Sequence, residues 1–140
     1  MKQTRILLVE DSDTDILLVQ EVLREHGINA ELKVVKDGAA AQHLIEMQES
    51  ACPDLIILDL NLPQVDGFTL LAVIRQRDWC RFTPVVVLTS SQAPRDREQA
   101  LKLGARRFLH KVADWDKFLA LGDVFKEMLS AEQYPASEAH

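Results

Sequence analysis

The most constraining feature of the sequence is a run of four apolar residues, Leu55 to Leu58, that ends on Asp59. Pro53 lies just before the run and Pro63 shortly after it. A short apolar run with turn-forming residues on both sides is typical of a strand buried on both faces of a parallel sheet. The carboxyl ends of such strands open into the ligand crevice of a doubly wound fold. We therefore expect Asp59 at the rim of a crevice, and an aspartate that only caps a turn is the simpler alternative.

Similar apolar runs recur along the chain, and each is followed by apolar residues at helical spacing. This alternation predicts a doubly wound α/β fold, with a parallel sheet covered by helices on both faces. Gly27 and Gly104 stand where two of the helices should end. The expected strands are residues 5–9, 32–35, 55–58, 85–88 and 106–109, and the expected helices are roughly residues 13–26, 39–49, 67–77, 95–103 and 114–129.

The length and composition indicate one ordinary globular domain. The chain has 140 residues, of which 47% are hydrophobic and 27% are charged. We expect the domain to span residues 4–130 and the polar segment 131–140 to be a disordered tail. The formal net charge of -6 disfavours direct binding of nucleic acid, which requires a basic face. Since no apolar run approaches the roughly 20 residues of a membrane span and no signal-peptide pattern is present, we expect a cytoplasmic protein without a membrane partner.

The cysteines and histidines indicate no metal site. Cys52 and Cys80 lie far apart without a CxxC spacing, so we expect small buried or half-buried side chains. His26, His43 and His110 have no metal-ligand spacing, and we expect incidental surface residues.

A set of polar side chains follows the expected strands. Its members are Glu10 and Asp11 after the first strand, Asp59 after the third, Thr89 after the fourth and Lys111 after the fifth. Because all carboxyl ends of a parallel sheet lie at one edge, these side chains should meet there. Carboxylates 4 Å apart repel by about 4 kcal/mol in a surface-like dielectric, so such a cluster usually binds a cation, and oxygen ligands suit Mg²⁺. Taken singly, the acids could be solvated turn residues, the threonine a turn residue and the lysine a surface residue.

The loop after the first expected strand disfavours a nucleotide-binding site. It contains acids and no glycine, so it lacks the glycine-rich cradle with which doubly wound nucleotide-binding proteins hold phosphates. No Ser/His/Asp or Cys/His arrangement is apparent either. What remains is a carboxylate nucleophile with Mg²⁺, and with Thr89 and Lys111 to bind phosphoryl oxygens, which amounts to aspartyl-phosphate formation.

As an ordered set, these residues resemble the receiver domains of response regulators in two-component (His–Asp phosphorelay) signalling, across roughly residues 4–130. The matching motifs are Glu10-Asp11, Asp59 with the following Leu60-Asn61-Leu62-Pro63-Gln64-Val65-Asp66-Gly67, Thr89-Ser90, and Lys111. The resemblance implies a flavodoxin-like (βα)5 fold with strand order 2-1-3-4-5. The stretch from Asp59 to Pro63 is most similar to stand-alone receivers, including those that serve phytochrome-type sensor kinases.

The resemblance also implies how the site would work. Asp59 would accept a phosphoryl group from the phosphohistidine of a sensor histidine kinase or a His phosphotransfer protein. Asp11, Asp59 and the backbone carbonyl of Asn61 would ligate Mg²⁺, and Glu10 would assist through water. Lys111 would contact a phosphoryl oxygen. The protein would be a phosphoacceptor that assists its own phosphotransfer and autodephosphorylation, not an enzyme acting on other substrates.

A second group of positions would carry the signal. Thr89 would move to hydrogen-bond the phosphoryl group, and the burial of Phe108, the expected switch aromatic, would follow that movement; a plain core residue is an equal alternative for Phe108. Phosphorylation adds about -1.5 to -2 charge and new acceptor oxygens, which would bias a two-state surface. That surface would be the fourth helix, fifth strand and last helix, where the exposed candidates are Arg97, Lys102, Arg106, Trp115 and Lys117.

One position departs from the family pattern. The family usually has a proline in a cis peptide after its lysine, whereas Val112 follows Lys111 here. A cis bond before a residue other than proline costs about 2.5–4 kcal/mol. We therefore predict a trans peptide, with Lys111 still pointing into the crevice.

The sequence also indicates how the domain would pass on its signal, and it disfavours two other functions. No folded output domain follows the last expected helix, so we expect the signal to pass through another protein or through a homodimer. A haloacid dehalogenase-type phosphohydrolase would carry its Asp-x-Asp pattern on the first strand, whereas Asp59 lies on the third and position 61 is Asn. An interaction module with a relict site is disfavoured because the acids, Thr89 and Lys111 are all present.

Overall fold

The structure is a computed structural model, and it describes residues 3–47, 52–77 and 82–133. The strands are β1 (Thr4–Val9), β2 (Ala30–Val35), β3 (Leu55–Leu58), β4 (Val85–Thr89) and β5 (Arg107–His110). The helices are α1 (Asp13–Glu25), α2 (Gly38–Glu46), α3 (Gly67–Gln76), α4 (Pro94–Lys102), α5 (Trp115–Leu119) and α6 (Leu121–Gln133). Cys80 and the last two residues of the expected helix 39–49 lie outside the described residues.

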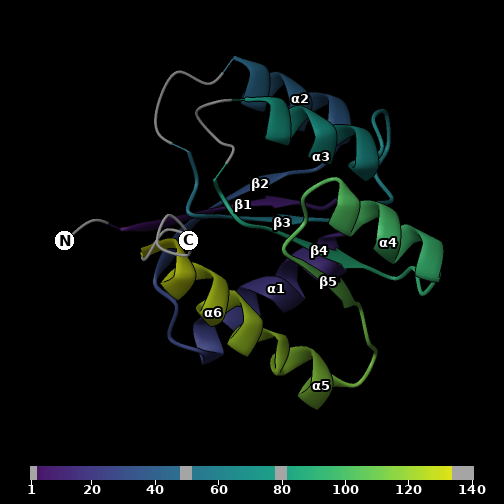
Figure 1. Cartoon of the computed structure of the whole chain (residues 1–140). Helices are drawn as coiled ribbons and strands as arrows, with labels where there is room; N and C mark the ends of the chain where they lie inside the picture. Colours follow the sequence, from purple (N-terminus) through teal and green to yellow (C-terminus); the bar gives the residue numbers. More distant parts are fainter. Residues whose placement is uncertain (1–2, 48–51, 78–81, 134–140) are drawn as a thin grey trace.

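The sheet has the expected topology. Its strands run parallel in the order β2-β1-β3-β4-β5 (Figure 1). The register places Val9 beside both Val35 and Leu58, and Leu58 beside Val87. The residues that follow β1 and β3 therefore leave the sheet side by side at one edge, as a doubly wound fold requires.

Helices cover both faces of the sheet. In Figure 1, α2, α3 and α4 lie on one side of the strands, and α1, α5 and α6 lie on the other. Ile56 and Leu58 of β3 belong to the core on the α2–α4 side, whereas Leu55 and Ile57 belong to the opposite core. All four are completely buried. Two buried faces explain why β3 is apolar throughout and does not alternate.

Side-chain caps and glycines define the helix ends. The capping residues are Ser12, Asp37, Asp66 and Asp114, which accept backbone N–H groups at the starts of α1, α2, α3 and α5. A cap of this kind stabilises a helix by about 1 kcal/mol. Gly27 and Gly104 have φ values of 67° and 109°, and they follow α1 and α4 where the sequence predicted helix ends.

The expectation of one continuous last helix over residues 114–129 is wrong. α5 ends at Leu119 and α6 begins at Leu121. The Leu119 carbonyl accepts a 2.8 Å hydrogen bond from Nε2 of His26, at the end of α1. The Asp123 N–H, which would bond that carbonyl in a continuous helix, donates to Ala120. His26 therefore links α1 to the helix junction, and our expectation of an incidental surface residue is wrong.

The last helix also extends further than expected. α6 continues to Gln133, so residues 131–133 are helical and not part of a disordered tail. Ala, Glu and Gln, which occupy these three positions, all favour helices. Residues 134–140 lie outside the described part of the chain. Within the described residues, no helix combines the length and the apolar character needed to cross a membrane.

Candidate functional site

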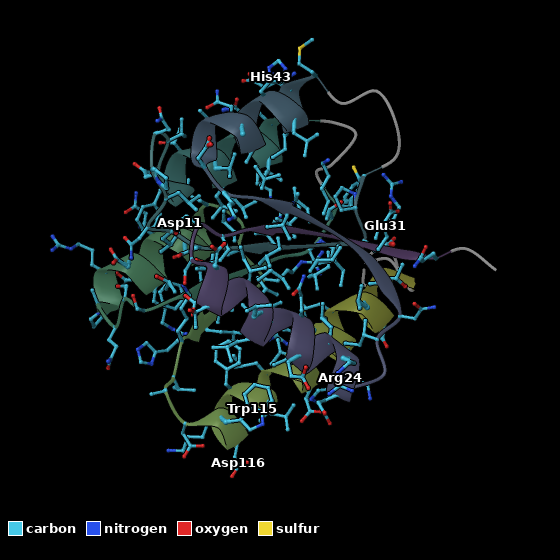
Figure 2. The ribbon with its side chains drawn as sticks, turned by 180° about the vertical axis from the view of Figure 1, so that it is seen from behind. Asp11, Arg24, Glu31, His43, Trp115 and Asp116 are labelled. Carbon is cyan, nitrogen blue, oxygen red and sulfur yellow. The ribbon has the colours of Figure 1, made fainter. Side chains whose placement is uncertain are left out.

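The ends of the strands bring the expected polar residues to one edge of the sheet. The backbone N–H of Glu10 donates to the last carbonyl of β2, and that of Asp59 donates to the last carbonyl of β1, each at 3.0 Å. The N–H of Lys111 donates to the last carbonyl of β4 at 2.8 Å. The rigid sheet therefore fixes where each of these side chains begins. Figure 2 shows Asp11 at this edge, with Glu31 at the opposite end of the sheet.

The ammonium group of Lys111 contacts three carboxylates. Its Nζ lies 2.9 Å from Glu10 Oε1, 3.1 Å from Asp59 Oδ2 and 2.7 Å from Asp15 Oδ2. Burial by itself would lower the pKa of Lys111. The hydrogen bonds to Asp15 and Glu10, together with the charges of Asp59 and Glu10, outweigh this effect and raise the pKa well above its usual value. Lys111 is therefore a fixed cation facing Asp59.

Asp59 is held by contacts to both of its carboxylate oxygens. Oδ1 accepts the backbone N–H of Asn61 at 3.1 Å, and Oδ2 accepts the ammonium of Lys111. The side chain is 5% exposed, so only a small part of it contacts solvent. A carboxylate that is oriented in this way has the geometry of a nucleophile.

The backbone after Asp59 folds back tightly. The N–H of Gly67 donates to Leu60 O at 2.9 Å, and a Cβ at Gly67 would lie 2.5 Å from Leu60 Cα. The backbone therefore requires a glycine at position 67, because the start of α3 approaches the end of β3 closely. In the same loop Gln64 has a φ of 75°, a region that costs a residue other than glycine free energy.

Glu10 is almost completely buried, with 2% of its side chain exposed. Burial raises its pKa to about 7; the hydrogen bond to Lys111 opposes this rise, and the charge of Asp59 adds to it. Oε2 accepts the backbone N–H of Ser12 at 3.2 Å. A divalent cation nearby would favour the ionised form of Glu10, because its charge offsets that of the carboxylate.

Glu10, Asp11 and Asp59 could hold a metal ion. One carboxylate oxygen of each residue lies within 4.8 Å of those of the other two. Glu10 and Asp59 are buried and Asp11 is exposed, so the cluster opens toward solvent at Asp11. Three carboxylate groups can carry more negative charge than the single positive charge of Lys111 offsets. Their hard oxygen atoms suit Mg²⁺. The donor set fits the expected cofactor, while ligation by the Asn61 carbonyl and a water-mediated role of Glu10 stay predictions.

Thr89 and Phe108 lie on the neighbouring strands β4 and β5. Thr89 is completely buried, and its Oγ1 accepts the N–H of Ser91 at 3.2 Å. A hydroxyl in this arrangement still has a proton to donate. Phe108 is half-buried against the core on the α2–α4 side, and Arg97 donates to its carbonyl at 3.4 Å. The roles assigned to Thr89 and Phe108 stay predictions.

The surface around α4, β5 and α5 is accessible where the sequence predicted it. The five residues expected to be exposed on this surface are indeed exposed, namely Arg97, Lys102, Arg106, Trp115 and Lys117. Figure 2 shows Trp115 on α5.

The peptide bond after Lys111 is trans, as predicted, since none of the described peptide bonds is cis. Val112 packs at the margin of the core formed by α1, α5 and α6. Lys111 nevertheless reaches Asp59, so valine in place of the family's proline leaves this contact intact.

The sequence interpretation missed Asp15. Asp15 lies in the first turn of α1, where an acid interacts favourably with the helix dipole whether or not it belongs to a site. The contact with Lys111 joins residues 96 positions apart in the chain. No local sequence pattern predicts such a pair, because the contact depends on how α1 packs beside the end of β5.

The sequence and the fold are similar to those of known proteins. Residues 6–121 match the family described as the response regulator receiver domain. Response regulator Rcp1 from Synechocystis sp. is 41% identical over 133 residues, which cover 92% of this chain and 86% of Rcp1.

Three solved structures are similar to this one. The phosphorylated cyanobacterial phytochrome response regulator RcpA has a TM-score of 0.83 and 31% identity, over 93% of this chain and 96% of RcpA. The Mn²⁺-bound form of Rcp1 has a TM-score of 0.73 and 40% identity, over 94% and 93% of the two chains. The receiver domain of sensor histidine kinase PA1611 from Pseudomonas aeruginosa PAO1, with a magnesium ion coordinated in its active site cleft, has a TM-score of 0.74 and 28% identity, over 92% and 99%. Divalent metal ions in two of these structures agree with the acidic cluster found here.

Proposed function

The chain belongs to the response regulator receiver domain family, and from this premise we propose that Asp59 accepts a phosphoryl group from the phosphohistidine of a sensor histidine kinase or of a His phosphotransfer protein. The observation that carries the proposal is the pairing of Asp59 with Lys111 at 3.1 Å, beside two further carboxylates within reach of a shared metal ion. This combination of one oriented carboxylate, one fixed cation and one candidate metal cluster suits transfer of a phosphoryl group better than it suits any other chemistry considered above.

In the transfer, a carboxylate oxygen of Asp59 bonds to phosphorus while the bond from phosphorus to the histidine nitrogen breaks. The imidazole keeps the electron pair of that bond and takes up a proton. Cations that face the transferred group stabilise the charge on its three outer oxygens. Lys111 is one such cation. Mg²⁺ held by Asp11, Asp59 and the backbone carbonyl of Asn61, with Glu10 assisting through water, would supply the other.

Phosphorylation would then change the surface of the domain. The new oxygens on Asp59 attract the ammonium of Lys111 and the hydroxyl proton of Thr89. A shift of Thr89 opens or closes space for Phe108 beside α4, which alters the surface of α4, β5 and the two helices α5 and α6, into which the last expected helix divides. That surface would control a partner protein or self-association as a homodimer, and the expected cytoplasmic location stays a prediction.

Phosphorylation by a small donor tests the proposal without the cognate kinase. The protein is incubated with acetyl phosphate and Mg²⁺, and its intact mass is followed. We expect the wild type to gain one phosphoryl group and Asp59→Asn to gain none. Asp54→Asn is the matched control, since Asp54 lies at the opposite end of the same strand and accepts the Arg5 N–H at 2.8 Å, which an asparagine can also do.

Three other results would contradict the proposal. A folded wild type without any mass gain, either alone or with sensor kinases supplied, would indicate a relict interaction module. A mass gain that persists in Asp59→Asn would place the acceptor elsewhere. Rapid turnover of many phosphate esters would indicate a phosphohydrolase.

A further inference from the structure

Asp15 contributes the third carboxylate around Lys111. It is neither the proposed phosphoryl acceptor nor a member of the cluster that could hold a metal ion. Its Oδ2 lies 2.7 Å from Lys111 Nζ, closer than the oxygens of Glu10 at 2.9 Å and Asp59 at 3.1 Å. The side chain is 24% exposed, so the contact is partly shielded from water.

The local structure leaves the carboxylate of Asp15 available for this contact. Asp15 is the third residue of α1, and its backbone N–H donates to the capping hydroxyl of Ser12 at 3.2 Å. In a capping box the side chain at this position would bond back to the N–H of the cap residue. Here Glu10 Oε2 accepts the Ser12 N–H instead. Among the described residues, Lys111 is the only hydrogen-bond partner of the Asp15 carboxylate.

Asp15 differs from the other two partners of Lys111 in one respect. Glu10 and Asp59 also belong to the cluster that could hold a metal ion, whereas Asp15 does not. Oxygens of Glu10 and Asp59 are therefore shared between the ammonium and the metal site. Asp15 is the one anchor whose hold on Lys111 does not compete with metal binding.

We propose that Asp15 is a positioning residue, which holds the ammonium of Lys111 toward Asp59 before and during phosphoryl transfer. This inference rests on the proposed function. An ammonium group has three N–H donors, and the three carboxylates each take one. When a phosphoryl oxygen replaces Asp59 Oδ2 as the third acceptor, Asp15 and Glu10 still orient the other two donors. Without Asp15 the four-carbon lysine stem would sample more conformations, and fewer of them would face the phosphoryl group.

A simpler explanation makes the opposite prediction. If Asp15 only adds negative charge beside the start of α1, its removal should attract the anionic acetyl phosphate more strongly and speed up phosphorylation. If Asp15 positions Lys111, its removal should slow the reaction in spite of this attraction. The sign of the change therefore separates the two explanations.

The test compares Asp15→Ala, which removes the acceptor for Lys111, with Asp13→Ala. Asp13 lies in the same helical turn and pairs with Lys36, but that pair is exposed, with 78% and 57% of the two side chains accessible. Initial rates with Mg²⁺ are measured over a range of acetyl phosphate concentrations. We expect Asp15→Ala to lower the maximal rate about tenfold, the order of effect seen when an outer partner of a site residue is removed, with little change in the half-saturating concentration. Asp13→Ala should stay within about twofold of the wild type, and an Asp15→Ala rate equal to or above the wild type would overturn the inference.

A second measurement does not depend on phosphorylation. The ¹H–¹⁵N NMR signal of the Lys111 ammonium should be protected from solvent exchange in the wild type and in Asp13→Ala, and its exchange should be clearly faster in Asp15→Ala. Equal exchange in all three proteins would refute the positioning role. A wild type that shows this pattern but takes up no phosphoryl group would refute the proposed function and leave the contact of Asp15 with Lys111 supported.

Discussion

Replacement of Lys111 by methionine tests the central feature of the site. Methionine keeps most of the length and apolar volume of the side chain but removes the charge. Three carboxylates then lose their common cation, at original distances of 2.7, 2.9 and 3.1 Å. Glu10 and Asp59, with 2% and 5% of their side chains exposed, cannot regain full hydration in the folded protein.

The expected magnitude follows from these distances and from burial. Two unit charges 3 Å apart at an effective dielectric constant of 20 interact by roughly 5 kcal/mol. Desolvation offsets part of this energy, and removal of one partner of a buried ion pair typically costs about 3–5 kcal/mol. We expect Lys111→Met to lose about 3 kcal/mol of unfolding free energy at pH 8 in the presence of EDTA, at the low end of that range because Asp15 is partly hydrated. This loss is a large part of the roughly 5–15 kcal/mol that stabilises an ordinary domain.

Urea denaturation at pH 8, with EDTA or with Mg²⁺, measures the effect. Mg²⁺ should stabilise Lys111→Met more than it stabilises the wild type, because no ammonium then competes for the carboxylates of the metal cluster. Lys36→Met is the matched control, since its partner Asp13 is exposed and such pairs contribute about 0–1 kcal/mol. Equal stability of Lys111→Met and the wild type in EDTA would refute the reasoning, as would an equally large loss in Lys36→Met.

Two further predictions concern the loop after Asp59 and the titration of Glu10. Gly67→Ala should cost about 1–3 kcal/mol and slow phosphorylation by acetyl phosphate, because its Cβ would lie 2.5 Å from Leu60 Cα and 2.8 Å from Asp59 O. Gly122→Ala, where the Cβ would meet the ring of His26 away from the site, should be destabilised without a slower reaction; equal slowing in both variants would contradict this account. In EDTA, Glu10 should make the folded protein less stable as the pH rises from about 4.5 to 7, because its pKa of about 7 means that the folded state holds the proton more tightly than the unfolded state does. The difference in unfolding free energy between wild type and Glu10→Gln should therefore change by at most about 3 kcal/mol over this range, and a difference independent of pH would show that the raised pKa is absent.

The central strands and the residues at their ends could be predicted from the sequence because each depends on local information. A strand buried on both faces must be apolar throughout, so the run from Leu55 to Leu58 identified β3 and located Asp59 at its end. Parallel pairing then required the ends of β1, β3 and β5 to share one edge of the sheet. The contacts of Lys111 with Glu10 and Asp59 agree with that deduction.

The break between α5 and α6 could not be predicted in this way. Residues 114–129 have an apolar face at helical spacing, and that spacing continues across the break. Two features that join segments distant in sequence determine the backbone conformation at this break. His26, the residue that follows α1, donates a hydrogen bond to the Leu119 carbonyl, and Gly122 leaves room for the imidazole ring.

The sequence by itself determined the order of strands and helices, the two-sided burial of the sheet and the set of residues at its carboxyl edge. These properties follow from hydrophobic periodicity and from the geometry of parallel strands, which act over a few residues at a time. Only the tertiary structure decided that Asp15 joins Glu10 and Asp59 around Lys111, and that Glu10 is buried enough to raise its pKa to about 7. Both depend on the distance between chain segments and on the exclusion of water from the space between them, and no local pattern of residues encodes either quantity.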